Sequence, residues 1–302
     1  MNWRKILSGK IKFNEPLSKY TTFKIGGAAE IFFQPKDVSD LKQLLINAKK
    51  DRQRILVIAG GSNLLINDKG IAGVVIKLDS PFFKKISHKG RLLNAGAGLS
   101  LSGLVKYALD HNLSGAEFLT GIPGTVAGAL VMNAGISEKI KNKNAKIKNI
   151  GGLVKAVTVM DYNGKVKILK KQEIKFDYRS SNLYNYIVLK AALKLGKGNQ
   201  RTIRNNLKKY QQPRKRNLDY AYPSAGCVFK NPKNQSAGWL IDQCGLKGRQ
   251  CGDAAISKRH ANFIINKGKA KAEDVLKLMN LVKKTVADRF KIQLEPEIKI
   301  WQ

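Results

Sequence analysis

Apolar residues along this chain follow two spacings, one typical of strands and one typical of helices. Apolar runs predict strands at residues 28–34, 55–59, 64–66, 74–76, 92–95, 187–195 and 261–266. Helical spacing predicts one helix that begins at Asp37 or Ser39 and a second, over residues 101–112, that Ser100 caps; all three are residue types that cap helix N-termini. Residues 1–19 are predicted to form a short helix and a lead-in.

Turn residues organise the second half of the chain. Tyr162-Asn163-Gly164 predicts a hairpin between strands at residues 153–161 and 165–169. Further helices are predicted at residues 202–212, ending before Pro213, at 237–243 and at 272–290, with a last strand at 294–301. A change of composition at residues 197–199 predicts a domain boundary. The expected domains are residues 1–198, with subdomains of about 1–78 and 79–198, and residues 199–302.

Two glycine-rich turns stand out against this pattern. Residues 115–135 read GAEFLTGIPGTVAGALVMNAG and carry little charge apart from Glu117. Gly121-Ile-Pro-Gly-Thr cannot form a helix interior, and the small residues after it allow a backbone or a flat ligand to come close. The second turn, Gly60-Gly61-Ser62-Asn63, ends a predicted strand and offers backbone N–H groups to a phosphate. Either turn alone is compatible with a packed core, but two together favour a long ligand with a pyrophosphate and a flat ring system.

Charge introduces a competing hypothesis. The chain of 302 residues has 56 Lys+Arg against 21 Asp+Glu, a net charge of +35, which attracts polyanions. The basic residues are spread along the chain, aromatic residues make up 8%, and neither zinc-finger spacing nor an RNA-binding aromatic signature is present. The lysine-rich residues 136–150 are interpreted as a solvated basic loop or strand edge. A nucleic-acid binder remains an alternative, and no metal site is expected.

The cysteines and the N-terminal residues indicate the cellular compartment in which the protein is expected. Cys227, Cys244 and Cys251 are an odd number of cysteines, and the N-terminal residues contain no apolar secretory segment. No apolar run approaches transmembrane length. We therefore expect reduced thiols, a cytoplasmic protein and no membrane association.

Seven ordered motifs carry a resemblance to a known family. They read YTTFKIGG, AGGSNLL, GAEFLTGIPGTVAGALVMNAG, FDYRSSNL, YPSAGCVFKNP, SKRHANFIIN and LEPEI, and they extend from about Tyr20 to Trp301. The chain resembles the UDP-N-acetylenolpyruvoylglucosamine reductases (MurB) of bacterial peptidoglycan synthesis. The short connection from Arg179 to Cys227 is similar to the type II form of that family.

The resemblance implies a fold and two cofactors. The fold would be α+β, with a vanillyl-alcohol-oxidase-like (PCMH-type) FAD-binding domain of two subdomains and a smaller C-terminal α+β substrate-binding domain. FAD would be bound, and NADPH would reduce it as co-substrate before the enolpyruvyl substrate enters the same cleft. The residues that match the family's pyrophosphate turn and flavin segment are Gly60, Gly61, Ser62, Asn63, Thr120, Gly121, Ile122, Gly124, Thr125 and Ala127.

The resemblance also implies three catalytic residues. Arg179 would stabilise the negative charge that develops beside the substrate carboxylate, although it could instead pair with Asp177. Glu297 matches the family's second activating residue, which can donate a hydrogen bond only if a dry site keeps it protonated. Cys227 stands where the family usually has serine, and a thiol is the stronger acid, so we expect Cys227 to protonate the substrate. A buried, inert thiol is the alternative, which we prefer for the other two cysteines.

Substrate residues and partners follow from the same resemblance. Tyr222, Lys230 and Asn231 match positions near the substrate phosphate and sugar, and the stretch from Arg214 to Asn217 departs from the family pattern, so the residue that holds the uridine diphosphate is left unassigned. His260 is interpreted as structural. The expected partner is a small UDP-sugar, with no specific nucleic acid and no membrane, and the oligomeric state stays open. A related FAD oxidoreductase with another sugar or alcohol substrate remains the second alternative.

Overall fold

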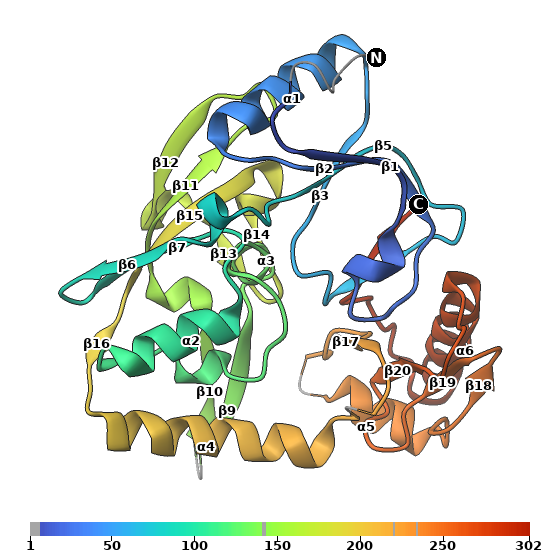
Figure 1. The fold of residues 1–302 in the computed structure, drawn as a ribbon. Coiled ribbons are helices and arrows are strands. Elements are labelled where there is room, and N and C mark those ends of the chain that lie inside the picture. The colour runs from blue at the N-terminus through green and yellow to red at the C-terminus, as the bar shows by residue number, and fades with distance from the viewer. Residues whose placement is uncertain (1–6, 141–142, 220, 234) are drawn as a thin grey trace. The chain divides into compact units, whose positions relative to one another are not determined.

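The computed structural model describes residues 7–140, 143–219, 221–233 and 235–302 (Figure 1). Packing divides the chain into two compact units, and neither is continuous in sequence. The first unit consists of Met1–Ile11, Phe33–Gly60 and Val75–Arg214, and the second of Lys12–Phe32, Gly61–Val74 and Lys215–Gln302.

The N-terminal strands form a four-stranded sheet with the order β1-β2-β5-β3. Its strands are β1 (Lys10–Pro16), β2 (Ala28–Gln34), β3 (Ile55–Ile58) and β5 (Ile71–Lys77). Helix α1 (Val38–Lys50) connects β2 to β3 and begins where the Asp37 carboxylate accepts a hydrogen bond from the Asp40 N–H at 3.0 Å. The predicted strands and the cap at Asp37 are confirmed.

The helix predicted at the start of the chain is wrong where the structure describes it. Residues 10–16 form strand β1, and a 3₁₀ turn, Leu17–Tyr20, follows. β1 lies at the edge of the sheet beside β2, and only Glu15 in it is buried. Sheet pairing therefore overrides a weak local preference here. The part of that prediction that falls on residues 1–6 lies outside the described residues.

The first unit is built on a five-stranded sheet with the order β12-β11-β15-β7-β6, in which every neighbouring pair is antiparallel. Its strands are β6 (Ile86–Lys89), β7 (Leu92–Gly96), β11 (Val154–Met160), β12 (Val166–Lys170) and β15 (Ile187–Lys194). The predicted hairpin at Asn163 is confirmed as β11–β12. Helix α2 (Leu101–Asp110) begins at Ser100, whose hydroxyl accepts from the Gly103 N–H, as predicted.

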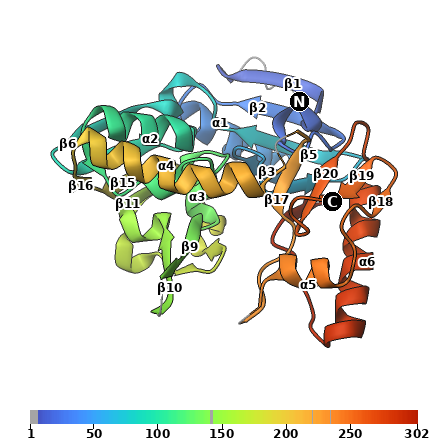
Figure 2. The same ribbon diagram turned by 90° about the horizontal axis from the view of Figure 1, so that it is seen from below.

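Shorter elements complete the first unit. They are α3 (Val126–Val131), β8 (Leu113–Ser114), β9 (Gly135–Ile140), β10 (Lys143–Asn149), β13 (Phe176–Asp177), β14 (Ser180–Ser181), β16 (Gly196–Lys197) and the 3₁₀ turns Pro81–Lys84, Glu117–Leu119, Ile150–Leu153, Lys171–Glu173 and Asn182–Asn185. The lysine-rich stretch forms the antiparallel pair β9–β10, which follows α3 (Figure 2).

Helix α4 (Gln200–Asn217) does not end at Pro213 as the sequence predicted. Pro213 lies inside the helix, and the next residue, Arg214, donates from Nη1 to the Gly121 carbonyl oxygen at 2.8 Å. A proline removes one backbone donor and crowds the preceding turn but does not forbid continuation. The bond from Arg214 is a tertiary contact that sequence reasoning could not see.

The second unit contains a four-stranded sheet with the order β17-β20-β19-β18. Its elements are β4 (Leu64–Ile66), β17 (Ser224–Cys227), β18 (Gln250–Cys251), β19 (Ala254–Ile256), β20 (Phe263–Asn266), β21 (Lys299–Trp301), α5 (Ala237–Gln243) and α6 (Ala272–Phe290). Helix α6 packs on β18 and β19 (Figure 1), and both helices have the predicted bounds. Strand β4 pairs in parallel with β21. The core of this unit also takes in Phe23, Ile25 and Leu65 from the N-terminal half of the sequence.

Candidate active site

In the first unit, the two glycine-rich turns are in backbone contact. A Cβ added to Gly60 would lie 2.5 Å from the Gly124 Cα, closer than side chains approach a backbone. A Cβ added to Gly128 would lie 3.0 Å from the Ala59 Cβ. The turn after β3 and the start of α3 therefore pack with no room for a side chain at Gly60. Two motifs that the sequence singled out separately are brought together.

Lys77, which sequence reasoning missed, lies at the same place. Its Nζ donates to the Ala59 carbonyl oxygen at 3.2 Å, next to the glycine turn. Burial lowers the pKa of the Lys77 ammonium from its ordinary value. The Lys77 amine is thus held against the backbone that leads into the predicted pyrophosphate turn. Nothing in the sequence distinguishes this lysine from the others.

The flavin segment is held by the chain that precedes α2. Gly121 and Gly124 have φ values of +70° and +130°, which favour glycine. The Gly124 carbonyl oxygen accepts from the Leu101 N–H at 3.0 Å, and the Ala127 N–H donates to the Ala97 carbonyl oxygen at 3.0 Å. The Thr125 hydroxyl caps α3. Of the predicted residues of this segment, Thr120, Ile122, Gly124, Thr125 and Ala127 are half-buried and Gly121 is exposed, which suits a ligand that lies along them.

Arg179 lies between β13 and β14 with a φ of +54°, a conformation that is uncommon for arginine. Its Nη1 donates to the Gly135 carbonyl oxygen at 3.1 Å, and its guanidinium lies 5.4 Å from the centre of the Tyr178 ring. Gly135 is the last residue of the glycine-rich stretch. The predicted catalytic arginine and the predicted flavin segment are therefore linked within the first unit.

Two side chains position the hairpin that carries Arg179. Asn133 is buried, donates from Nδ2 to the Asp177 carbonyl oxygen at 2.9 Å and accepts from the Gly151 N–H at 3.2 Å. The Ser181 hydroxyl is buried against the Leu130 carbonyl oxygen at 2.9 Å. Sequence reasoning assigned no role to either. Asn133 directly follows the apolar residues 129–132, where a polar side chain needs a hydrogen-bond partner once it is buried, and that position is a signal that could have found it. Nothing in the polar sequence around Ser181 distinguishes that serine.

In the second unit, hydrogen bonds join three predicted site segments. The Glu297 N–H donates to the Val228 carbonyl oxygen at 2.8 Å, directly after Cys227 in the chain. The Asn63 Nδ2 donates to the Glu297 carbonyl oxygen at 3.1 Å. The Lys299 N–H donates to the Asn63 carbonyl oxygen at 3.0 Å. The segments of Asn63, Cys227 and Glu297 are thus adjacent although they are far apart in sequence.

Gly226 brings the thiol strand close to the pyrophosphate turn. Its φ is +79°, and a Cβ added to it would lie 4.0 Å from the Ser62 carbonyl oxygen. The turn itself contains Gly61, whose φ is +61° and whose added Cβ would lie 2.0 Å from the Tyr20 carbonyl oxygen. Backbone rather than side chains therefore surrounds the turn at Gly61 and Gly226. Such a turn fits a pyrophosphate, which binds through backbone N–H donors.

The predicted substrate residues lie in the same unit, and two of them, Lys230 and Asn231, have structural partners. Lys230 Nζ lies 3.1 Å from the Glu295 carboxylate, in an ion pair that is largely exposed on the glutamate side. The Asn231 Oδ1 accepts from the Ala237 N–H at 3.0 Å and so holds the start of α5. Tyr222 is exposed. A role in substrate binding for these three residues stays a prediction.

The three cysteines are half-buried, and none of them forms a disulfide in the part of the chain that the structure describes. Burial raises the pKa of the Cys244 thiol, which disfavours its reactive thiolate form. Cys251 Sγ lies 4.0 Å from an Asp274 carboxylate oxygen. Among the described residues, no group of three histidine, cysteine or acidic side chains could hold a metal ion.

His260 is packed where a structural residue would be. Its Nδ1 accepts a hydrogen bond from the Asn262 N–H at 3.2 Å, and its ring lies 4.8 Å from the Phe263 ring. Burial lowers the pKa of the imidazole below its ordinary value. Burial therefore makes this imidazole harder to protonate than a histidine in water.

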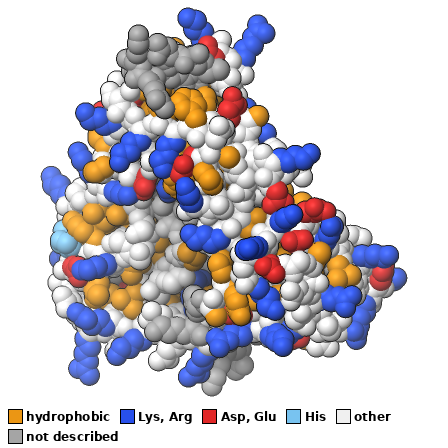
Figure 3. Space-filling model, turned by 45° about the vertical axis from the view of Figure 1, so that its right-hand side comes forward, with side chains coloured by type: hydrophobic (Ala, Val, Ile, Leu, Met, Phe, Trp, Pro, Cys, Tyr) orange, Lys and Arg blue, Asp and Glu red, His pale blue; other side chains and the backbone are white. Residues whose placement is uncertain are grey.

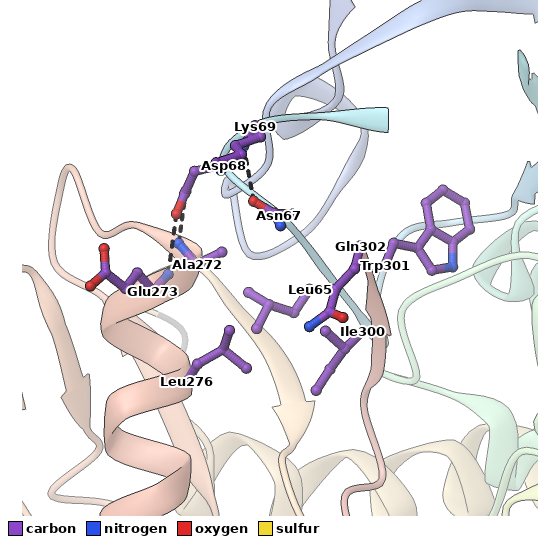
Figure 4. A pocket seen from close by; sticks show the side chains of 10 residues that line it. All are labelled: Leu65, Asn67, Asp68, Lys69, Ala272, Glu273, Leu276, Ile300, Trp301 and Gln302. Carbon is purple, nitrogen blue, oxygen red and sulfur yellow. Dashed lines mark hydrogen bonds between the residues drawn. The ribbon is translucent and has the colours of Figure 1, made fainter. Parts of the chain in front are cut away.

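A cavity of about 270 Å³ lies in the second unit at the first turn of α6 (Figure 4). Leu65, Leu276 and Ile300 supply its apolar lining, and the Asp68 carboxylate accepts from the Ala272 and Glu273 N–H groups. The predicted site residues are not among the residues that line it. We therefore do not take this cavity for the active site.

Basic side chains are scattered over the face of the molecule in Figure 3 rather than gathered in one patch. Helix α4 has no acidic residue in its sequence and contains Arg201, Arg204, Lys208, Lys209, Arg214, Lys215 and Arg216.

Within the part of the chain that the structure describes, no helix is both long and apolar enough to span a membrane.

Comparison with known proteins defines the class of protein. Residues 29–170 match the family described as an FAD binding domain, and residues 217–301 match the C-terminal domain of UDP-N-acetylenolpyruvoylglucosamine reductase. Together with the packed glycine turns at Gly60 and Gly124 and the β13–β14 hairpin that carries Arg179, these matches define an FAD-dependent oxidoreductase. The expected α+β fold, with an FAD-binding domain and a C-terminal domain, is confirmed.

Similar proteins identify the family. UDP-N-acetylenolpyruvoylglucosamine reductase of Caldanaerobacter subterraneus is 41% identical over 97% of this chain and 94% of its own length. That of Listeria monocytogenes is 39% identical over 96% of this chain and 94% of its own length. The crystal structure of the Thermus caldophilus reductase (MurB) is 35% identical, with a TM-score of 0.81 over 98% of this chain and all of that one. The chain belongs to the UDP-N-acetylenolpyruvoylglucosamine reductase family.

Proposed function

We propose that this chain carries out the family's reaction with Arg179, Cys227 and Glu297 as its catalytic residues. The protein is an FAD-dependent reductase of peptidoglycan synthesis, which uses NADPH to reduce the enolpyruvyl group of UDP-N-acetylglucosamine enolpyruvate to UDP-N-acetylmuramate. The three residue roles are our proposal.

The residues present fit FAD. A Cβ on Gly60 would meet the Gly124 backbone, Gly61 and Gly124 have positive φ, and the predicted flavin-segment residues other than the exposed Gly121 are half-buried, so glycine backbone rather than side chains shapes this place. Gly60, Gly61, Ser62 and Asn63 would hold the pyrophosphate. Residues 120–127 would hold the ring system. When bound, FAD supplies the hydride that NADPH has delivered.

Arg179 would act on the charge that develops in the substrate. Addition of hydride to a double bond conjugated with a carboxylate leaves negative charge beside that carboxylate. A guanidinium is permanently charged and donates in a fixed planar geometry, so it stabilises this charge without first having to be reorganised. The bond to Gly135 and the strained backbone support a guanidinium that is held in one orientation.

Cys227 would then supply the proton that the new carbanion needs. The observation that supports this role is the hydrogen bond from the Glu297 N–H to the Val228 carbonyl oxygen at 2.8 Å. This bond holds the backbone directly after Cys227 beside the backbone of Glu297, the proposed second activating residue. Glu297 would donate a hydrogen bond from its protonated form, and Cys227 would transfer its proton to carbon.

The finer assignments are proposals of the same kind. Tyr222, Lys230 and Asn231 would bind the phosphate and the sugar, and residues 199–302 would form the substrate domain beside an FAD domain at 1–198. The small-molecule substrate requires no nucleic acid or membrane partner, and we propose a cytoplasmic location. On the face shown in Figure 3 the basic side chains are scattered, which supports a contribution to solubility.

A spectroscopic experiment tests the reaction and the thiol together. The purified protein should carry a yellow chromophore that bleaches with NADPH under anaerobic conditions and recovers when UDP-N-acetylglucosamine enolpyruvate is added. Bleaching without recovery would indicate another acceptor, and a colourless protein that fails to take up FAD would favour the polyanion binder. Cys227→Ala should bleach normally and recover slowly, whereas Cys227→Ser should keep substantial activity. Normal recovery in Cys227→Ala would rule out the proton-donor role.

A further inference from the structure

Thr22 joins two parts of the second unit that the proposed mechanism uses. Its N–H donates to the Gly61 carbonyl oxygen at 3.1 Å, in the pyrophosphate turn. Its hydroxyl donates to the Ser224 carbonyl oxygen at 2.7 Å, at the start of β17, the strand that ends at Cys227. One residue of the N-terminal segment is therefore bonded to both the turn and the thiol strand, and its hydroxyl lies closer to the Ser224 carbonyl oxygen, at 2.7 Å, than to the Gly61 carbonyl oxygen, at 3.5 Å.

The segment around Thr22 is itself fixed in the core of that unit. Phe23 is fully buried in the core, and its carbonyl oxygen accepts from the Asn266 Nδ2 at 3.1 Å. The Thr21 hydroxyl is buried and donates to the Ile25 carbonyl oxygen at 3.2 Å. Asn266 belongs to β20, the strand that pairs with β17. Thr22 therefore lies between two residues, Thr21 and Phe23, that buried contacts hold in place.

Strand β17 needs such a support because its pairing is interrupted. Ser224 pairs with Ile265 and Cys227 with Phe263, so three steps along β17 oppose two along β20. Gly226 lies in this bulge with a φ of +79°. A bulge leaves a residue outside the ladder and lets the strand bend. The ladder alone therefore does not fix the direction in which β17 delivers Cys227.

We propose that the Thr22 hydroxyl is a positioning group for the reaction, which anchors β17 at Ser224 and so places the Cys227 thiol relative to the pyrophosphate turn. This inference rests on the proposed role of Cys227. It makes a claim separable from cofactor binding, because the Thr22 N–H holds the Gly61 carbonyl oxygen at 3.1 Å, whereas the hydroxyl reaches that oxygen only at 3.5 Å. Loss of the hydroxyl should disturb protonation of the substrate and leave cofactor binding intact.

Thr22→Val and Thr22→Ser in the full-length holoenzyme test this claim. Valine has the shape of threonine without its hydroxyl, and serine keeps the hydroxyl. In Thr22→Val we expect FAD affinity and the rate of flavin reduction by NADPH to stay within about twofold of the unchanged protein, and the rate of recovery with substrate to fall about tenfold, the scale of one lost hydrogen bond. Thr22→Ser should recover at nearly the normal rate.

A second readout does not depend on activity. Hydrogen exchange of the backbone amides of residues 224–228 should be faster in Thr22→Val than in Thr22→Ser, because the strand has lost an anchor. Equal recovery rates in all three proteins would overturn the proposal. So would a Thr22→Val protein that loses FAD binding and both half-reactions together, since that pattern indicates a general structural role.

The Cys227 variants separate this inference from the proposed function. If Cys227→Ala recovers normally while Thr22→Val is slow and exchanges faster, the role of the thiol fails and the anchoring of β17 stands. If Cys227→Ala is slow while Thr22→Val is normal, the thiol keeps its role and the Thr22 proposal fails.

Discussion

The side-chain amide of Asn63 donates to the backbone carbonyl oxygen of Glu297 at 3.1 Å, across 234 positions of sequence. The bond ties the last residue of the pyrophosphate turn to the backbone of a proposed catalytic residue. The Lys299 N–H returns a bond to the Asn63 carbonyl oxygen, so the two segments are held at two points.

We predict that Asn63→Asp slows recovery of the flavin colour with substrate more than Asn63→Ala does. Alanine removes the donor, whereas aspartate places a second acceptor against the Glu297 carbonyl oxygen. The expected decrease is about tenfold for alanine, the scale of one hydrogen bond, and larger for aspartate. Anaerobic rapid mixing measures it. An Asn63→Asp protein with unchanged recovery would show that this bond does not position Glu297.

Gly60→Ala should weaken FAD binding. The added Cβ would lie 2.5 Å from the Gly124 Cα, so the two glycine turns must separate, at a cost of roughly 1–3 kcal/mol for an overpacked contact. The fraction of purified protein that carries flavin, and its affinity for added FAD, measure the effect. Gly152→Ala is the matched control, since its Cβ would meet only Asn149 Oδ1 at 3.7 Å. Equal flavin content in the two variants would contradict the prediction.

Asn262→Leu should destabilise the second unit strongly. The buried amide accepts from the Phe229 N–H at 2.9 Å and donates to the Phe229 carbonyl oxygen at 2.7 Å. Leucine leaves both buried backbone groups without these partners, which costs about 1–3 kcal/mol for each group. Urea denaturation measures the free energy of unfolding. Asn47→Ala removes a half-buried side chain whose amide donates to the Gln43 carbonyl oxygen in an exposed hydrogen bond, and it should change that free energy by less than about 0.5 kcal/mol. A similarly small change in Asn262→Leu would refute the prediction.

His260 should make stability depend on pH on the acid side of neutrality. Burial lowers the pKa of the folded-state imidazole below its unfolded value of about 6.5, so the unfolded chain binds the proton more readily. The contribution of His260 to the free energy of unfolding is therefore complete above the pKa that its imidazole has in the unfolded chain. It is lost as the pH falls through the lower pKa that the imidazole has in the folded protein. Protonation would also remove the Nδ1 lone pair that accepts from the Asn262 N–H.

His260→Asn tests this dependence. The asparagine side chain supplies an acceptor oxygen and does not titrate. Its free energy of unfolding should fall less between pH 7 and pH 5 than that of the unchanged protein, while the two should run parallel between pH 7 and pH 8. Parallel curves over the whole range would remove His260 as the source.

Local sequence signals determined many of the elements. Capping by Asp37 and Ser100, the turn at Asn163, and apolar spacing along α6 predicted helices and a hairpin that the structure contains. These signals are local, because a cap or a turn satisfies backbone groups within a few residues of itself. The ordered motifs also identified the family and its cofactor from the sequence alone.

The tertiary structure decided how those elements combine. Residues 12–32 and 61–74 belong to one compact unit with the C-terminal residues, and β4 pairs with β21 rather than with its neighbour in sequence. Thr22, Asn133 and Asn262 take their roles from carbonyl and N–H groups that lie far away in the chain. A buried polar side chain needs a hydrogen-bond partner, and its residue type predicts that need from the sequence. Which backbone N–H or carbonyl group becomes the partner is decided only when the whole chain packs.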